Sequence, residues 1–101
     1  MDSRIKQVLR LLKAYHPDRV ILFGSYARGS FDHYSDLDLV VIKRTRKRFL
    51  DRIKEVIEII KPRFSVDILV YTPGEFRRMA RSGNAFIRDV VKEGKILYEK
   101  R

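Results

Sequence analysis

Two aspartates separated by a single residue form the pattern in this sequence that most strongly suggests chemistry. Asp36 and Asp38 stand at the start of the apolar run Leu37–Ile42. Side chains two positions apart on a β-strand point to the same face, so both carboxylates would lie together. Neighbouring carboxylates repel each other unless a cation lies between them, and oxygen-only ligands suit Mg²⁺ or Mn²⁺. The pattern therefore predicts a divalent-metal site at the start of a core strand.

A glycine and a serine upstream form a candidate phosphate site. Gly24-Ser25 follows the apolar run Arg19–Phe23, and ten residues separate Ser25 from Asp36. Glycine lets a backbone approach a ligand closely, and a helical turn that begins there points free N–H groups at an anion. Ser25 can add a hydroxyl donor and Arg28 a positive charge. The alternative is a tight strand-to-helix turn with a capping serine, which is the commoner use of this pattern.

A third carboxylate interrupts a later apolar run. Asp67 is the only charged residue in 66–71. The short connection between the first two apolar runs predicts an antiparallel pair of strands, whereas the helix-length connection to the third run predicts a parallel pair. These directions bring the end of the first strand and the starts of the other two to one end of a sheet. Because a buried unpaired carboxylate is costly, we expect Asp67 to join Asp36 and Asp38 in one metal site.

The remaining pattern alternates helices with strands. Helices are predicted over 3–15, 47–61, 74–81 and 84–92, with a helical turn at 25–29, and strands over 19–23, 37–42, 66–71 and 96–98. In the helix over 47–61, the apolar spacing predicts a buried face formed by Leu50, Ile53, Ile57 and either Ile60 or Val56. The alternation indicates an α/β (α+β) fold, with a small mixed sheet and flanking helices. The length of 101 residues predicts one domain over 1–101.

The chain is strongly basic. Lys plus Arg number 23 against 13 Asp plus Glu, which gives a formal charge of +10. Such an excess favours polyanionic partners, with a highly charged solvated surface as an equal alternative. Five of the six residues in Lys43–Arg48 are basic. This run follows the far end of the second strand, about 15–20 Å from the aspartates, so it is a poor triphosphate clamp. It could bind RNA or an acidic protein face, or be a solvated helix start.

The composition excludes several classes of protein. Hydrophobic residues make up 45 % of the chain, which excludes a disordered tail. No apolar stretch approaches the length needed to cross a bilayer, and the first residues lack the apolar core of a signal peptide. The absence of cysteine excludes disulfides and thiolate metal sites. We therefore expect a cytoplasmic protein without a membrane partner.

The motifs together resemble those of a known family. They consist of Gly24–Gly29 (GSYARG), Ser35–Asp38 (SDLD) and a later acidic residue on a third strand. This combination resembles the DNA polymerase β nucleotidyltransferase superfamily, and in particular its minimal nucleotidyltransferase (MNT) branch. The motifs span roughly 19–71, and the order of elements matches over the whole chain. The second domain that holds the base and the acceptor in larger members has no counterpart in the pattern.

The resemblance implies a role for each residue of the motifs. Asp36 and Asp38 would bind two Mg²⁺ ions, for which Mn²⁺ could substitute, and Asp67 would complete one metal site and help deprotonate the attacking hydroxyl. Gly24 and Ser25 would hold the β- and γ-phosphates of the nucleoside triphosphate, ATP. The enzyme would move AMP to an acceptor by in-line attack on the α-phosphate, with pyrophosphate as the leaving group.

The resemblance also implies a partner. Short MNT proteins often accompany a HEPN-domain ribonuclease toxin as its antitoxin, and the expected reaction is AMPylation of a toxin tyrosine. Two alternatives remain open: an antitoxin that neutralises its toxin by binding alone, and a basic nucleic-acid-binding module or RNA nucleotidyltransferase. The grouped acids favour an enzyme over a pure binder. The lack of base-stacking aromatics beside the basic run argues against a nucleic-acid module.

Overall fold

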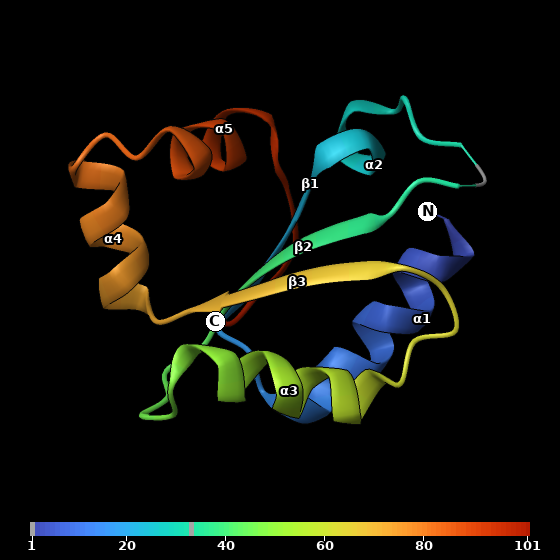
Figure 1. Ribbon diagram of the computed structural model, residues 1–101, viewed down its shortest axis with the longest axis horizontal. Helices are drawn as coiled ribbons and strands as arrows, with labels where there is room; N and C mark the ends of the chain where they lie inside the picture. The colour runs from blue at the N-terminus through green and yellow to red at the C-terminus, as the bar shows by residue number, and fades with distance from the viewer. Residues whose placement is uncertain (1, 33) are drawn as a thin grey trace.

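The alternating pattern folds into a sheet with helices on both faces (Figure 1). The computed structural model describes residues 2–32 and 34–101. Its elements are α1 (Ser3–Leu12), the 3₁₀ turn η1 (Lys13–Tyr15), β1 (Arg19–Phe23), α2 (Gly24–Arg28), β2 (Leu37–Ile42), α3 (Phe49–Ile60), β3 (Val66–Tyr71), α4 (Pro73–Arg81), α5 (Ala85–Glu93) and β4 (Lys95–Glu99). Every predicted helix and strand is present, although the first helix becomes a 3₁₀ turn after Leu12. Among the described residues, no helix combines the length and apolar character that crossing a bilayer requires.

The sheet has four strands in the order β3-β2-β1-β4. β1 pairs antiparallel with both β2 and β4, and β2 pairs parallel with β3. A parallel pair needs a long crossover, which α3 provides. The predicted directions of the first three strands are therefore confirmed, and the end of β1 lies beside the starts of β2 and β3.

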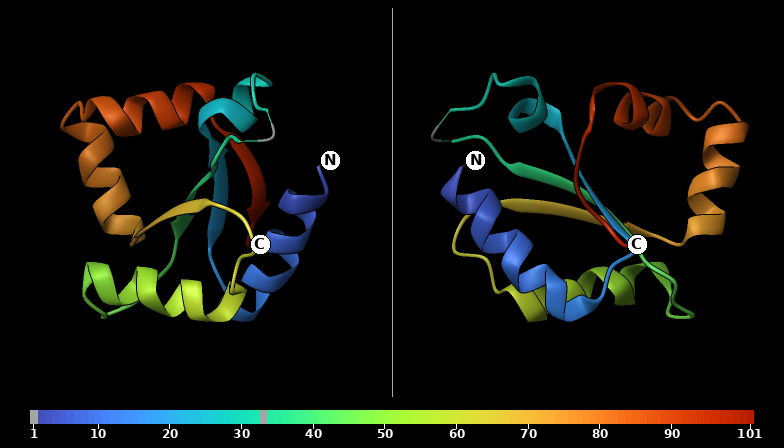
Figure 2. Two further views of the ribbon diagram at one scale, coloured as in Figure 1. Left: turned by 45° about the vertical axis from the view of Figure 1, so that its right-hand side comes forward. Right: turned by 180° about the vertical axis from the view of Figure 1, so that it is seen from behind.

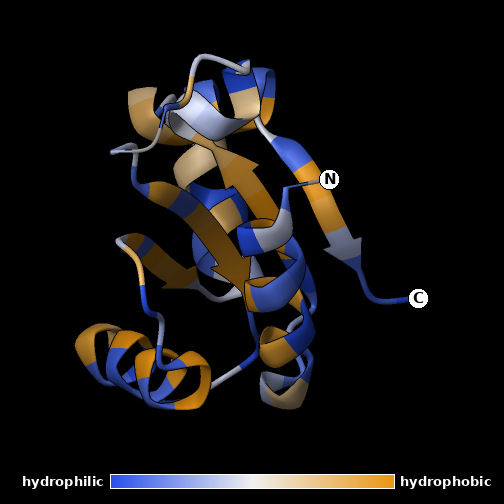
Figure 3. Cartoon of the chain, turned by 90° about the vertical axis from the view of Figure 1, so that its right-hand side faces the viewer, coloured by the Kyte–Doolittle hydropathy of each residue, from blue (hydrophilic) through white to orange (hydrophobic). Residues whose placement is uncertain are grey.

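The two faces of the sheet bury different side chains. Below one face, α1 and α3 pack on a large apolar cluster that includes Leu12, Leu22, Leu39 and Val70. On the other face, α4 and α5 cover a smaller cluster around Ile21, Val40, Ile42 and Val90 (Figure 2). The central strands are therefore apolar on both faces, whereas the helices alternate between apolar and polar residues (Figure 3).

The buried face of α3 differs from the prediction. Leu50 is 75 % exposed, and Ile53 and Ile57 are only half-buried. The buried residues of this helix are Arg52, Val56 and Ile60. A prediction from apolar spacing treats an arginine as a surface residue. It therefore places Leu50 and Ile53 on the buried face, where the structure has Arg52. Arg52 can be buried because tertiary contacts bond its guanidinium to three other residues.

Candidate active site

Three aspartates lie at one end of the sheet. Asp36 precedes β2, Asp38 lies within β2 and Asp67 lies within β3. The strand register pairs Asp38 with Asp67 across the parallel strands and with Phe23, at the end of β1, across the antiparallel ones. Residues paired across neighbouring strands project to the same face. The structure thus pairs Asp38 with Asp67, as the strand directions predict, and places Asp36 just outside β2, where its charge still acts on Asp38.

Asp38 is the most strongly perturbed of these carboxyl groups. Its pKa is raised to about 6, first by burial and then by the negative charge of Asp67, a hydrogen bond with Asp67 and the charge of Asp36. The positive charge of Arg28 acts in the opposite direction. Three like charges around a half-buried position attract a proton or a cation. The electrostatics of this sheet end therefore favour binding of a positive ion.

The three carboxylates are suitable ligands for a hard divalent cation, but the described side chains are not arranged closely enough to hold one. All three candidates are carboxylates, which Mg²⁺ and Mn²⁺ prefer. Within residues 2–32 and 34–101, no three Asp, Glu, His or Cys side chains are gathered closely enough to hold a metal ion. The negative charges of Asp67 and Asp36 raise the pKa of Asp38, so a cation bound there would compete with a proton for that carboxylate. Asp67 is exposed, so its side chain has room to turn toward a bound ion.

Gly24 lies directly against Asp38. Its φ is +72°, in the left-handed region, and a Cβ added to it would overlap Oδ2 of Asp38. Gly24 begins α2, followed by the half-buried Ser25. The N-cap residue is Phe23, and no side chain caps this helix. Ser25 is therefore not a capping serine, and the glycine lets the backbone of the β1–α2 turn approach the aspartates.

Arg28 is the last residue of α2 and is exposed. Its guanidinium is 3.8 Å from the carboxylate of Glu93 on α5, and both side chains are about half exposed. Exposed ion pairs of this kind are weak. Arg28 is therefore available to a phosphate, and its partner in the structure is a glutamate of α5 rather than one of the three aspartates.

A small cavity beside Gly24 was not predicted. Its volume is about 250 Å³, and besides Gly24 and Arg28 it is lined by Phe23, Phe86, Asp89 and Glu93. The rings of Phe23 and Phe86 meet edge to face, with centroids 5.3 Å apart. Neither Phe86 nor Glu93 is among the site residues that the sequence predicts. One indication of this cavity is present in the sequence, because Phe23 directly precedes Gly24. Phe86, Asp89 and Glu93 line it only because α5 packs beside the β1–α2 turn.

We expect Gly24→Ala to destabilise the fold and to displace Asp38, whereas Gly29→Ala should only destabilise. Both glycines have a left-handed φ, +72° and +75°, so each substitution should cost about 1–2 kcal/mol in the free energy of unfolding. At Gly29, however, an added Cβ has no atom within 4 Å. Urea unfolding and nucleotide-transfer assays on both variants check this. Equal transfer activity in the two variants would contradict the role given to Gly24.

Comparisons with known proteins place the chain in a family. A family model described as "Nucleotidyltransferase domain" matches residues 3–98. A protein of Methanocaldococcus jannaschii named "Putative protein adenylyltransferase MJ0604" is 28 % identical over 100 residues, which cover 96 % of this chain and 97 % of that protein. Another protein of the same organism, "Putative protein adenylyltransferase MJ0141", is 38 % identical over 81 residues, covering 76 % of this chain and 75 % of the relative.

Solved structures share the fold. A crystal structure described as "the toxin-antitoxin with AMP-PNP" has a TM-score of 0.62 at 21 % identity and covers 99 % of this chain and 76 % of that chain. A structure described as "putative minimal nucleotidyltransferase" has a TM-score of 0.58 at 27 % identity and covers 92 % and 88 %. The family match spans nearly all of the helices and strands that build the aspartate end of the sheet. The chain therefore belongs to the nucleotidyltransferase domain family, in the minimal form that the sequence predicts.

Proposed function

We propose that this chain transfers AMP from ATP to a protein hydroxyl, with a tyrosine of a HEPN-type ribonuclease toxin as the expected acceptor, and thereby acts as an antitoxin. The observation that carries the proposal is the Asp38–Asp67 pair, with Asp36 beside it and Gly24 against it. Two relatives named as adenylyltransferases and a similarly folded toxin–antitoxin structure with an ATP analogue support the reaction and the biological role.

In this proposal the aspartates would form the metal site. Asp36 and Asp38 would hold two Mg²⁺ ions, which Mn²⁺ could replace, and Asp67 would complete one of the two sites. Divalent ions bound there would supply positive charge to the triphosphate and to the attacking and leaving oxygens. Asp67 is exposed at the rim of the site, so its carboxylate can accept the proton of an approaching hydroxyl group.

The β1–α2 turn holds the triphosphate. Gly24 and Ser25 would donate backbone N–H groups, and Ser25 its hydroxyl, to the β- and γ-phosphates, because no side chain makes a capping hydrogen bond at the start of α2. Arg28 adds a positive charge by exchanging Glu93 for phosphate. The acceptor oxygen then forms a bond to the α-phosphorus, the bond from that phosphorus to the bridging oxygen breaks, and pyrophosphate leaves. In-line attack requires the oxygen to lie about 3–3.5 Å from the phosphorus.

A protein acceptor fits the surroundings of the aspartates. Asp36 and Asp67 are both exposed, so a tyrosine on a flexible loop or tail of a partner can reach them. A nucleic acid end would need a positioning groove, and the basic run follows the opposite end of β2. We further propose that residues 1–101 act as one catalytic domain in the cytoplasm, without a membrane partner.

The test is a transfer assay with labelled ATP and Mg²⁺ or Mn²⁺. The chain is mixed with a candidate HEPN-type toxin and, in a separate reaction, with tRNA. We expect label on a tyrosine of the protein, in an amount equal to the pyrophosphate released. Label on RNA alone would reject the protein acceptor. Neutralisation of the toxin without any label would identify an antitoxin that acts by binding.

A further inference from the structure

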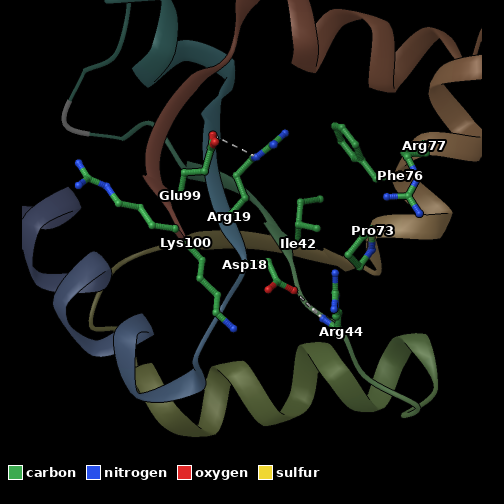
Figure 4. Close-up of a pocket in the computed structure, with 10 residues that line it drawn as sticks. Asp18, Arg19, Ile42, Arg44, Pro73, Phe76, Arg77, Glu99 and Lys100 are labelled. Atoms are coloured by element: carbon green, nitrogen blue, oxygen red, sulfur yellow. Dashed lines mark hydrogen bonds and ion pairs between the residues drawn. The ribbon is translucent and has the colours of Figure 1, made fainter.

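A second cavity lies at the end of the sheet opposite to the aspartates (Figure 4). Its volume is about 430 Å³, within the range of ligand-binding pockets. Arg19 at the start of β1 and Ile42 at the end of β2 line it, and these two residues pair in the sheet. Asp38 pairs instead with Phe23, at the other end of the same two strands. The cavity is therefore separate from the candidate active site.

Positive charges dominate this cavity. Arg44, Arg77, Lys100 and Arg101 all line it and are exposed. Arg19 is already paired with Glu99 at 3.5 Å. The part of the chain that the structure describes shows no ion pair for the other four cations. Because four charges from three segments remain without a carboxylate partner, this surface attracts a polyanion.

The lysines of the basic run 43–48 have structural roles. The ammonium of Lys43 donates to the backbone oxygen of Tyr15 at 2.7 Å and lies 4.9 Å from the centre of its ring. The ammonium of Lys47 is paired with Glu55 on α3. These two lysines attach the β2–α3 connection to the rest of the fold.

Two arginines of the run, Arg44 and Arg46, line cavities instead. Arg44 and Arg46 line a cavity of about 500 Å³ that adjoins the first one, because both cavities share Arg44 and Pro73. Arg77 of α4 borders the first cavity on the same side as Pro73 (Figure 4). Guanidinium groups bind phosphate oxygens in a two-pronged geometry that ammonium groups cannot form. The arrangement therefore matches a chain of phosphates.

An aromatic side chain, that of Phe76, lines the cavity. Phe76 lies on the α4 side, opposite Arg19 and Glu99, and is half-buried (Figure 4). This corrects the sequence interpretation, which found no base-stacking aromatic beside the basic run; the β3–α4 turn brings Phe76 there. Proteins that bind single-stranded nucleic acids combine an aromatic ring with basic side chains, because the bases stack on the ring while the phosphates contact the cations. An acidic protein face would use the arginines but not the ring.

Asp18 favours RNA over DNA as the ligand. It lines the cavity, and its Oδ2 accepts a hydrogen bond from the backbone N–H of Arg44 at 3.0 Å. A carboxylate repels phosphate but accepts a hydrogen bond from a ribose 2′-hydroxyl, which DNA lacks. We propose that this end of the sheet binds single-stranded RNA, with phosphates on Arg44 and Arg77, a base against Phe76 and a ribose beside Asp18.

The test measures binding of a fluorescent single-stranded RNA of about 12 nucleotides to the full chain, without nucleotide, over a range of salt concentrations. The double variant Arg44→Ala/Arg77→Ala should weaken binding at least about tenfold and lower the slope of log K against log salt by about 1.4, since each lost phosphate contact removes about 0.7. The control is Lys6→Ala/Arg10→Ala, which removes the same charge from exposed positions on α1 and should weaken binding less than about threefold.

A third variant tests whether the Phe76 ring contributes to RNA binding. Phe76→Leu keeps an apolar side chain against the core but removes the ring, so binding should weaken about tenfold with an unchanged salt slope. Thermal unfolding verifies that each variant is folded. Absence of RNA binding, or an equal loss in the α1 control, would overturn the proposal. DNA of the same sequence binding as tightly would reject RNA as the ligand, and tighter binding of polyglutamate would indicate an acidic protein partner instead.

Discussion

Asp36→Asn and Asp38→Asn should each reduce nucleotide transfer by at least about a thousandfold, which corresponds to about 4 kcal/mol of transition-state stabilisation. Asparagine has nearly the size of aspartate, so neither variant creates a cavity. Each removes a negative oxygen ligand where the fold gathers like charges. The measurement is the rate of label transfer from ATP at saturating Mg²⁺, with manganese binding followed in parallel by electron paramagnetic resonance.

The control for this result is Asp51→Asn. Asp51 is an exposed aspartate in the first turn of α3, so the same chemical change there should leave transfer within about twofold of wild type. Transfer near the wild-type rate in both active-site variants would rule out a mechanism that depends on these carboxylates. Retained transfer with lost manganese binding would separate metal binding from catalysis and contradict the roles proposed for them.

Asp38→Asn should also change the stability of the fold. The pKa of Asp38 is raised from 3.8 to about 6, so the folded protein disfavours the ionised carboxyl relative to the unfolded chain. This penalty is fully present above about pH 6 and disappears below the unfolded value near pH 4. In the presence of a chelator, Asp38→Asn should therefore be more resistant to urea than wild type at pH 8 and equal to it at pH 3. A less stable variant at pH 8 would indicate a structural role for Asp38.

Arg52→Ala should lower the free energy of unfolding by about 3 kcal/mol. Arg52 is 6 % exposed, and its guanidinium donates to both carboxylate oxygens of Glu75 at 2.7 and 3.2 Å. It also donates to the backbone oxygens of Val70 at 3.2 Å and Lys47 at 2.8 Å. Glu75 in turn accepts from the backbone N–H of Thr72 at 2.8 Å and caps α4. One side chain thus joins α3, β3 and α4, and its removal leaves several acceptors without a donor.

This loss should depend on pH. The pKa of Glu75 is lowered, chiefly by its hydrogen bond from Arg52, so the stabilisation is present above the unfolded pKa and is lost as pH falls through the folded one. The difference in urea stability between wild type and Arg52→Ala should therefore be larger at pH 7 than at pH 3. Arg88→Ala, at an exposed position on α5, should change stability by less than about 0.5 kcal/mol. A loss below about 1 kcal/mol for Arg52→Ala would contradict the proposed network.

The pairing of Asp38 with Asp67 at one end of the sheet could be predicted from sequence alone. The length of each connection sets the direction of the next strand, because a short loop returns antiparallel and a helix crosses over to a parallel strand. The period of two along a strand then places Asp38 on the face opposite to the buried Leu37 and Leu39, and the parallel register places Asp67 beside Asp38. The turn at Gly24 also follows locally, since glycine there permits a left-handed φ and a close approach.

The partners of the charged side chains were decided only by the tertiary structure. Arg52 is buried because Glu75, 23 positions away in the sequence, arrives beside it, and no periodicity encodes that distance. Glu93 reaches Arg28 and Phe86 reaches Gly24 in the same way, through the packing of α5. In the basic run, composition set the total charge, but the fold determined that Lys43 bonds to the backbone of Tyr15 and Lys47 pairs with Glu55, while Arg44 and Arg46 line an open cavity. A charge interacts with whatever lies within a few ångströms, and chain folding rather than sequence distance brings those groups together.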